Sequence, residues 1–357
     1  MLTVQNALVK EFCTSLNLKE FAPEKNLIEN QFNCLVLFIL AQLQNPHPSL
    51  KSYIKTIPQN FLEYPLFFME AELPKMKNTL LENRYNREIS DIKKIKELIP
   101  IANKKSNLTK GLDKNFTLAE IKHAYIAVAS RNFGIKLNNT KVSYSALAPF
   151  TDMFNYEPKL NNTIWSEDLK DENDFFTLKA NKNIAKGKQI FIWYGEDDNS
   201  KLLFDYGFTL KKNPFKLSNG DFLYTHKGKN YTGSLKINDA KNLIEIVNDY
   251  KEKNNLKFSK NEKEKKNDLE VFRSVLKSLK KYSNKKRIEE YKKNKNQNPN
   301  YVNIYRVLVN EDTLMDANIK KTEEIIQILE GGKQKLKEKT KSKVVKQNLK
   351  YFENLLK

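Results

Sequence analysis

The sequence predicts an α+β protein whose second part is mainly helical, and three observations support this fold class. Apolar residues of the first 134 positions recur at helical spacing. Between residues 141 and 193, short runs of β-branched and aromatic residues are typical of strands. From about residue 235 onward the pattern is again helical and rich in charge. With 357 residues the chain has room for two domains, and we place their boundary near residue 215.

In the first part, helices are expected between prolines. Their predicted bounds are 26–44, 49–57, 66–81 with an interruption at Pro74, 88–98 and 118–130. The last of these begins with a capping box, in which Thr117 is the N-cap and Glu120 follows three residues later.

The strand-like runs are 141–147, 175–180 and 189–193, and a short helix at 200–206 should end at Gly207. In the second part, strand pieces are expected within 214–231. Helices should follow at 241–250, 262–281, 303–318, 322–329 and 332–356. The segment 284–300, which is rich in Lys and Asn, is interpreted as a mobile loop.

Composition narrows the class of protein. A hydrophobic content of 39% and an aromatic content of 11% are typical of a globular chain. Two cysteines, Cys13 and Cys34, argue against a disulfide framework and fit a reducing compartment. The longest apolar run, 35–43, is far shorter than a membrane span of about 20 residues, and no secretory signal is visible. We therefore expect no membrane partner and a cytoplasmic or nuclear location.

The net charge of +20 invites a nucleic-acid interpretation, but its make-up argues against one. The chain has 57 Lys and only 6 Arg, and Arg is the residue that binds phosphates and guanine edges in a bidentate manner. Nucleic acid is therefore an unlikely partner on composition, and the lysines are interpreted as solvated surface. An acidic protein partner remains open.

Several common catalytic arrangements are absent from the sequence. It contains no GxGxxG after a strand, no GxxxxGK[ST], no GxSxG and no HExxH. The three histidines have no metal-ligand spacing, and we predict no metal site.

Two runs concentrate the chemistry of the chain. They are SALAPFTDMFNYEP at 145–158 and KGKQIFIWYGEDDNSKLLFDYGF at 186–208. Buried Tyr hydroxyls and Asn amides need partners, because each one left unsatisfied costs about 1–3 kcal/mol. Their apolar neighbours, such as Phe154 and Ile192, favour a polar pocket over a surface loop.

The same runs carry a resemblance to a known family. SALAPFTDMFNYEP resembles the xLxPxxDxxNH run of SET-domain methyltransferases, and IFIWYGEDDNSKLLFDYGF resembles the run that contains their catalytic tyrosine. ASRNF at 129–133 is similar to the SRxF that precedes both. The order, the spacing and SYIKTIP at 52–58 are most similar to the subgroup related to the Rubisco large-subunit methyltransferase (LSMT). VNIYRVLVNEDTL at 302–314 resembles a motif of that subgroup's trailing domain.

The resemblance implies an incomplete SET β-fold over residues 1–215, with a helical insert at about 20–130. A mainly α-helical, substrate-binding-like domain would cover 216–357. The family's Gly-rich strand pair, which wraps the methionine end of the cofactor, has no counterpart in the sequence as written. We therefore expect either a missing N-terminal part or a degenerate member with weakened cofactor binding.

The resemblance also implies an S-adenosylmethionine site with named residues. Tyr194 matches the catalytic tyrosine. Phe133 and Tyr206 match positions that line the substrate pocket. The positions that match cofactor-binding residues are Arg131, Asp152, Met153, Phe154, Asn155, Tyr156, Tyr206, Gly207 and Phe208.

Structural alternatives stay open for several of these residues. Tyr194 could be a core tyrosine that ends a strand, and Arg131 a charge at a helix C-terminus. Phe133 and Phe208 could serve packing alone, and Asn155 could be a turn residue. Tyr156 stands where the family has His, so any contact made by that ring is in doubt.

Physical chemistry agrees with this resemblance. Methyl transfer to an amine is an in-line displacement that needs positioning more than acid–base chemistry. Tyrosine hydroxyls can accept from the amine, and an apolar channel lowers the pKa of a lysine.

The first functional hypothesis is thus a protein-lysine N-methyltransferase that acts on a protein substrate, since Phe133 occupies a position that is polar in histidine-methylating relatives. The second is a non-catalytic SET-like protein-interaction module, and the third is a basic nucleic-acid binder. The sequence does not predict an oligomeric state.

Overall fold

The computed structural model describes residues 2–3, 9–12, 27–100, 109–137, 143–166, 168–169, 176–256, 262–294 and 298–356. The chain divides into two compact units. Unit 1 comprises Met1–Phe67, Arg87–Asp197 and Phe204–Gly207, and unit 2 comprises Phe68–Asn86, Asp198–Leu203 and Phe208–Lys357. A single boundary near residue 215 does not describe this division, because two earlier segments also belong to unit 2.

Unit 1 is built on a four-stranded sheet. Its strands are β1 (Leu2–Thr3), β2 (Asn132–Leu137), β3 (Ser143–Leu147) and β5 (Asp168–Leu169), in the order β1-β3-β2-β5. Strands β2 and β3 pair antiparallel with Phe133 opposite Ala146, and β5 runs parallel to β2. The expected strand at 141–147 is confirmed over the residues that the structure describes.

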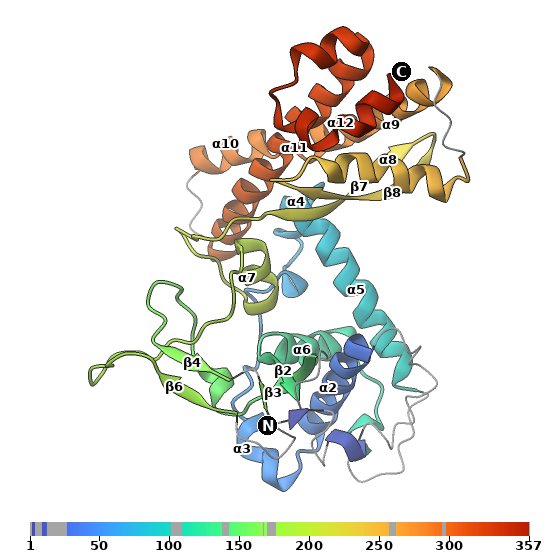
Figure 1. Ribbon diagram of the computed structural model, residues 1–357. Helices are drawn as coiled ribbons and strands as arrows, with labels where there is room; N and C mark the ends of the chain where they lie inside the picture. The colour runs from blue at the N-terminus through green and yellow to red at the C-terminus, as the bar shows by residue number, and fades with distance from the viewer. Residues whose placement is uncertain are drawn as a thin grey trace. The chain divides into compact units, whose positions relative to one another are not determined.

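Two helices, α2 (Leu27–Gln44) and α6 (Leu118–Ala129), lie beside this sheet (Figure 1). Residues 34–41 of α2 are all buried, which explains why this stretch of the helix contains only apolar residues. The predicted capping box is confirmed: the Thr117 hydroxyl accepts from the Glu120 amide, and the Glu120 carboxylate accepts from the Thr117 amide. Helix α6 therefore begins at a fixed residue and ends just before Arg131.

A second, small sheet pairs β4 (Thr163–Trp165) with β6 (Leu178–Ala180). Between these two sheets lies a core of buried apolar residues, with partly buried aromatic side chains packed against it. The buried members are Phe133, Ile135, Ala146, Ala148 and Ile192. This core carries the candidate site described below.

The remaining helical elements of this part of the chain are short, except α5. They are η2 (Pro48–Leu50), α3 (Lys51–Ile54), η3 (Pro65–Phe67), α4 (Leu73–Met76), α5 (Leu80–Leu98), η4 (Lys110–Leu112), η5 (Thr151–Met153) and α7 (Asn199–Tyr206). Gly207 follows α7 with φ +77°, as the predicted C-cap requires.

The predicted helix at 66–81 is wrong. The Glu72 carboxylate accepts from the Met69 amide at 2.7 Å, which closes a turn in place of a helix. Asn78 then adopts φ +57° two residues before α5 begins, which a continuous helix does not permit.

Unit 2 places a two-stranded hairpin against helices. The hairpin is β7 (Asn219–His226) with β8 (Lys229–Lys236), and the helices are α8 (Lys241–Lys253), α9 (Glu262–Tyr282), α10 (Lys285–Asn294), α11 (Pro299–Glu338) and α12 (Lys343–Leu355) (Figure 1). One continuous apolar core joins the hairpin to α8, α9, α11 and α12, with Phe222, Phe272 and Phe352 wholly buried.

Two predictions for unit 2 are wrong. The expected mobile loop at 284–300 contains α10 and the start of α11, because Ile288 is buried and the Lys and Glu around it are good helix formers. The helices expected at 303–318 and 322–329 form one helix, α11, whose backbone is interrupted only at Gly332, with φ +63°.

The strand expected at 189–193 is also wrong. Only one isolated bridge forms, between Asn155 and Phe191. The Asn162 side chain takes the place of a neighbouring strand: its oxygen accepts from the Phe191 amide at 2.8 Å, and its nitrogen donates to the Gln189 carbonyl at 3.0 Å.

Cys34 is buried and disulfide-bonded, so the expectation that the cysteines fit a reducing compartment is wrong at this position. Cys13 lies outside the described residues. Over the described ranges, every helix is too short or too polar to cross a lipid bilayer.

Candidate active site

A cavity of about 280 Å³ opens in unit 1 at the end of helix α6. Ser130 and Arg131 enter its wall from the C-terminal end of that helix, and Asn132, Phe133 and Gly134 from β2. The other lining residues are Asp152, Trp165, Ile192, Trp193, Tyr194 and Tyr206. Five parts of the sequence, at 130–134, 152, 165, 192–194 and 206, thus meet around one space.

Three tyrosine rings form a stack at this cavity. Tyr194 lies between Tyr156, 5.0 Å away and nearly parallel, and Tyr206, whose ring centroid is 4.4 Å away. The Tyr194 hydroxyl donates to the Phe154 carbonyl at 2.8 Å, and the Tyr156 hydroxyl donates to the Gly195 carbonyl at 2.9 Å. Because Tyr194 uses its proton in this bond, the lone pairs of its oxygen remain available as acceptors.

The tyrosines of the stack are neutral at physiological pH. Burial raises the pKa of Tyr194 to about 12, and the neighbouring Tyr64 adds to the rise. Burial also raises the pKa of Tyr206 and of Tyr156, with Asp197 acting on both in the same direction. The site therefore offers hydroxyl groups and aromatic faces but no phenolate nucleophile.

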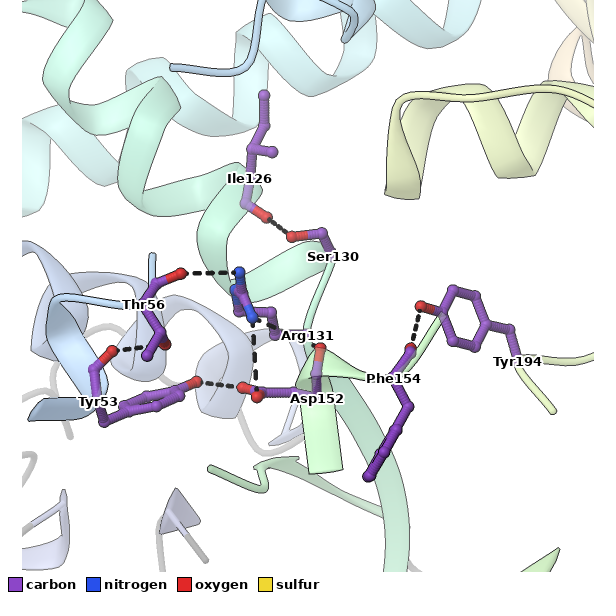
Figure 2. A network of polar contacts seen from close by, with 8 residues as sticks. All are labelled: Tyr53, Thr56, Ile126, Ser130, Arg131, Asp152, Phe154 and Tyr194. Carbon is purple, nitrogen blue, oxygen red and sulfur yellow. Dashed lines mark hydrogen bonds and ion pairs between the residues drawn. The ribbon is translucent and has the colours of Figure 1, made fainter. Parts of the chain in front are cut away.

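A buried ion pair lies in the same wall (Figure 2). The Arg131 guanidinium is 3.7 Å from Asp152 Oδ1 and donates to the backbone carbonyls of Asp152 and Thr56. Tyr53, on helix α3, donates its hydroxyl to Asp152 Oδ2 at 2.5 Å. The two side chains of the pair are 12% and 0% exposed, so solvent screens them little.

The Asp152 carboxyl is only partly compensated. Burial raises its pKa, while the Tyr53 hydrogen bond and the Arg131 charge oppose the rise. Asp152 Oδ1 accepts no hydrogen bond among the described residues. A buried carboxylate oxygen without a donor is suited to receive one from a bound group.

Aromatic side chains complete the cavity wall. Phe133 makes edge contacts with Trp165 and Phe176, at centroid distances of 5.4 and 5.0 Å. The Trp165 indole donates to the Trp193 carbonyl at 3.1 Å, which fixes its ring. These contacts hold the aromatic side chains of the wall in place.

The structure brings together five of the residues that the sequence singled out: Phe133, Arg131, Asp152, Tyr194 and Tyr206 all line the cavity. Tyr156 and Phe154 support Tyr194 from outside the cavity.

The other predicted residues are not part of the lining. Met153 is 54% exposed, and the Asn155 side chain is exposed, although its carbonyl accepts from the Ile192 amide at 3.0 Å. Gly207 packs on Tyr64, where a Cβ would lie 2.5 Å from a ring carbon. Phe208 is partly buried and belongs to unit 2.

Sequence reasoning missed Tyr53, Trp165 and Trp193 as parts of the site. Tyr53 lies 99 residues before Asp152, and nothing local in SYIKTIP signals that contact. Trp193 precedes Tyr194 directly, so its side chain could have been considered.

The chemistry of this cavity suits a cation. Aromatic faces and a buried carboxylate attract alkylammonium and sulfonium groups. The cavity volume of about 280 Å³ lies slightly below the lower end of the range, about 300–1,000 Å³, that is typical of sites for whole small molecules. It therefore fits an extended amine side chain and the charged end of a larger ligand. Among the described residues, no group of three or more potential metal ligands occurs.

Comparisons with known proteins point in the same direction. No protein-family model matches the sequence. SET domain-containing protein 4 of Artemia parthenogenetica is 26% identical over 201 residues, which are 53% of this chain and 47% of that protein. The ribosomal lysine N-methyltransferase set11 of Schizosaccharomyces pombe is 27% identical over 168 residues, covering 45% and 39% of the two chains. The actin-histidine N-methyltransferase of Xenopus tropicalis is 26% identical over 209 residues, covering 55% and 34%.

Solved structures resemble almost the whole chain. The SET domain of LSMT bound to lysine and AdoHcy superposes with a TM-score of 0.64 at 14% identity, over 99% of this chain and 88% of that one. Rubisco LSMT bound to AdoMet gives a TM-score of 0.63 at 15% identity, over 97% and 86%.

In sequence, the chain spans less than half the length of the curated relatives it matches. The α+β prediction and the resemblance to SET-domain proteins are confirmed, and the chain has the fold of the LSMT SET structures.

Proposed function

We propose that the chain is an S-adenosylmethionine-dependent protein-lysine N-methyltransferase. The observation that carries this proposal is the pair of neutral tyrosines, Tyr194 and Tyr206, 4.4 Å apart in an aromatic cavity that also holds a buried carboxylate. The names of the relatives support the reaction class, since they include lysine and histidine N-methyltransferases. The solved structures with a similar fold carry AdoMet or AdoHcy, which supports the cofactor.

In this proposal Tyr194 is the catalytic residue, and Phe133 and Tyr206 contact the substrate side chain. The residues proposed to hold the cofactor are Arg131, Asp152, Met153, Phe154, Asn155, Tyr156, Tyr206, Gly207 and Phe208. Among these, the lining positions of Arg131 and Asp152 give the strongest support, because a buried carboxylate oxygen that accepts no hydrogen bond from the described residues can receive one from a cationic ligand.

S-adenosylmethionine, when bound, supplies an electrophilic methyl group on a sulfonium. The protein's own contribution is position and desolvation. The Tyr194 hydroxyl stays protonated and donates its hydrogen bond to the Phe154 carbonyl. Its oxygen can therefore accept a hydrogen bond from the amine or contact a polarised methyl group. The aromatic walls disfavour a charged ammonium, which lowers the pKa of an inserted lysine and exposes its lone pair.

Lysine is proposed as the acceptor. Phe133 and Trp165 line the cavity with the tyrosines, and Phe176 packs against both rings; these apolar side chains suit an alkyl chain. Histidine is the competing acceptor, because the actin-histidine relatives match over a similar length. The two differ in the product, so mass spectrometry of the methylated residue separates them.

The test is a methyl-transfer assay with methyl-labelled S-adenosylmethionine, using ribosomal proteins and actin as candidate substrates. We expect label on a lysine, and loss of at least about a hundredfold in rate for Tyr194→Phe. Tyr231→Phe is the matched control: it removes a hydroxyl that bonds to Asn254 at 3.3 Å in unit 2, and it should retain wild-type activity.

Melting temperatures of both variants exclude simple unfolding as a cause. If Tyr194→Phe transfers methyl groups as fast as the wild type, Tyr194 is not the catalytic residue. If calorimetry detects no S-adenosylmethionine binding to the wild type, the enzyme proposal fails and an interaction module is favoured.

A further inference from the structure

The positive charge of this protein is concentrated in its second part. Residues 208–357 contain 36 Lys and Arg against 19 Asp and Glu, a net charge of +17, whereas residues 1–207 have a net charge of +3. A uniform excess of lysine along the chain would not produce this difference. The excess positive charge is therefore a property of residues 208–357, and it needs an explanation of its own.

Within this part, residues 333–350 hold the densest basic segment: eight Lys and one acidic residue, Glu338. Six of these lysines are exposed, and we call them the basic surface: Lys333, Lys337, Lys341, Lys343, Lys346 and Lys350. They lie at the end of α11, in the turn that follows and on α12 (Figure 1).

The basic surface is poor in compensating charges. Glu338 pairs with Lys335 at 2.8 Å, and Lys335 lowers the pKa of Glu338. No ion pair of the six lysines occurs with any residue that the structure describes. By contrast, basic residues of α9 and α10 face acids of α11, as in Arg273–Glu330, Lys280–Glu323 and Lys285–Asp316.

Two observations indicate that these charges do not serve folding. Lys343 and Lys346 lie in the first turn of α12, which has no acidic residue, although the positive end of the helix dipole disfavours cations there. Lys343 also lowers the pKa of Lys321, a smaller effect than burial, because the two ammonium groups repel each other. Unfavourable placements of this kind are retained mainly where function needs them.

The opposite face of α12 shows what does serve folding. Val344, Val345 and Phe352 are buried in the core of unit 2, and Ser342 caps the helix by accepting from the Val345 amide at 3.1 Å. The lysines occupy the remaining, solvent-facing positions. The helix is thus anchored by one face and presents an unpaired cationic face.

From these observations we infer that the basic surface binds an acidic segment of a protein partner. Its composition favours protein over nucleic acid: residues 333–350 include neither Arg, which reads bases and grips phosphates, nor an aromatic residue on which a base could stack. Lysine supplies point charges on flexible stems, which suit the irregular carboxylates of an acidic peptide.

If the chain is a methyltransferase, the partner is the substrate protein or a neighbour of it. In this respect alone the inference rests on the proposed function. Binding itself needs no methyl transfer. The proposal and the enzyme assignment can therefore fail separately.

The experiment measures binding of a fluorescein-labelled peptide of alternating Glu and Ser to the full chain by fluorescence anisotropy. The peptide has no Lys or His, so it cannot be a methyl acceptor. The test variant reverses three charges, Lys341→Glu, Lys343→Glu and Lys346→Glu. Its matched control is Lys182→Glu, Lys186→Glu and Lys188→Glu, three exposed lysines of unit 1 whose reversal changes the net charge equally.

We expect the wild type to bind the peptide with an affinity that falls as salt rises, and the test variant to bind about tenfold more weakly or worse. The control should stay within about twofold of the wild type, because the inference assigns the binding to α12 and its neighbours. Triple Lys→Gln replacement at the test positions should give an intermediate loss, and circular dichroism should show that α12 is retained.

Three outcomes would overturn the inference. If the control variant loses as much affinity for the peptide as the test variant, the loss is explained by the change in net charge alone. Equal binding of a peptide with Gln in place of Glu would remove the role of carboxylates. Tighter binding of an oligouridylate of the same charge would assign the surface to nucleic acid.

Discussion

Glu311 should make the stability of unit 2 fall as the pH rises toward neutrality. Its carboxylate lies in the core of unit 2, where Oε2 accepts from the Leu80 amide at 3.0 Å and Oε1 from the Leu81 amide at 2.7 Å. These are the first residues of α5, so the carboxylate caps that helix. Burial nevertheless dominates and raises the pKa of Glu311 to about 7, against the opposing effect of the two amides.

The sign follows from the two states. The unfolded carboxyl titrates near its ordinary value of 4.5 and the folded one near 7, so the folded state binds more protons between these values. The stabilisation is complete below about pH 4.5 and is lost as the pH rises through about 7. At 1.36 kcal/mol per pKa unit, the loss amounts to about 3 kcal/mol, an order-of-magnitude figure.

The measurement is urea unfolding followed by far-UV circular dichroism, on the wild type and on Glu311→Gln, at several values from about pH 4.5 to about pH 8. Gln keeps one acceptor oxygen and cannot ionise, so the variant loses one amide partner at every pH, at a cost of about 1–3 kcal/mol. Other groups titrate equally in both proteins.

The unfolding free energy of the wild type minus that of Glu311→Gln should therefore fall by about 3 kcal/mol from acid to neutral pH and stay level above it. Hydrogen exchange at the Leu80 and Leu81 amides provides a local check on the same cap. Parallel pH profiles for the two proteins would refute the reasoning, because they would mean that Glu311 ionises as it does in water.

Three further substitutions test local features. Tyr53→Phe removes the 2.5 Å hydrogen bond to the buried Asp152 and should lower the unfolding free energy by about 1.5–3 kcal/mol in a denaturant titration. Gly207→Ala places a Cβ 2.5 Å from the Tyr64 ring at φ +77° and should cost more than about 1 kcal/mol, seen as a lower melting temperature. Lys343→Glu puts an acid in the first turn of α12 and should add about 0.3–1 kcal/mol, seen as a higher melting temperature at low salt.

Each expectation has a clear contrary result. If the stability of Tyr53→Phe is unchanged, another group has taken the place of the Tyr53 hydroxyl as hydrogen-bond donor to Asp152. If Gly207→Ala has the same melting temperature as the wild type, the Tyr64 ring moves aside at no cost in free energy. A destabilised Lys343→Glu would assign this lysine a role in folding and weaken the inference about the basic surface.

Local signals predicted the parts of the structure that depend on neighbouring residues. The Thr117–Glu120 capping box and the Gly207 C-cap each lie within one helical turn, and both are found as expected. The resemblance assigned Tyr194 and Tyr206 to one site, and their ring centroids lie 4.4 Å apart.

Features that depend on distant contacts could not be predicted. The strand expected at 189–193 failed because the Asn162 side chain takes the hydrogen bonds that a second strand would have taken. Tyr53 reaches Asp152 only through the tertiary fold, since 99 residues separate them. The loop expected at 284–300 failed for another reason: polarity was given more weight than the helix propensity of Lys and Glu.

The two tryptophans of the chain, Trp165 and Trp193, both stand in the wall of the candidate site, and the sequence has no others. When the excitation wavelength selects tryptophan over the 16 tyrosines, the intrinsic emission of the purified protein therefore comes from that one place. Any molecule that enters displaces water from the indoles or stacks near them, and the emission should change in intensity and wavelength. The protein thus carries its own unlabelled reporter of occupancy, which can screen for ligands before a substrate is known.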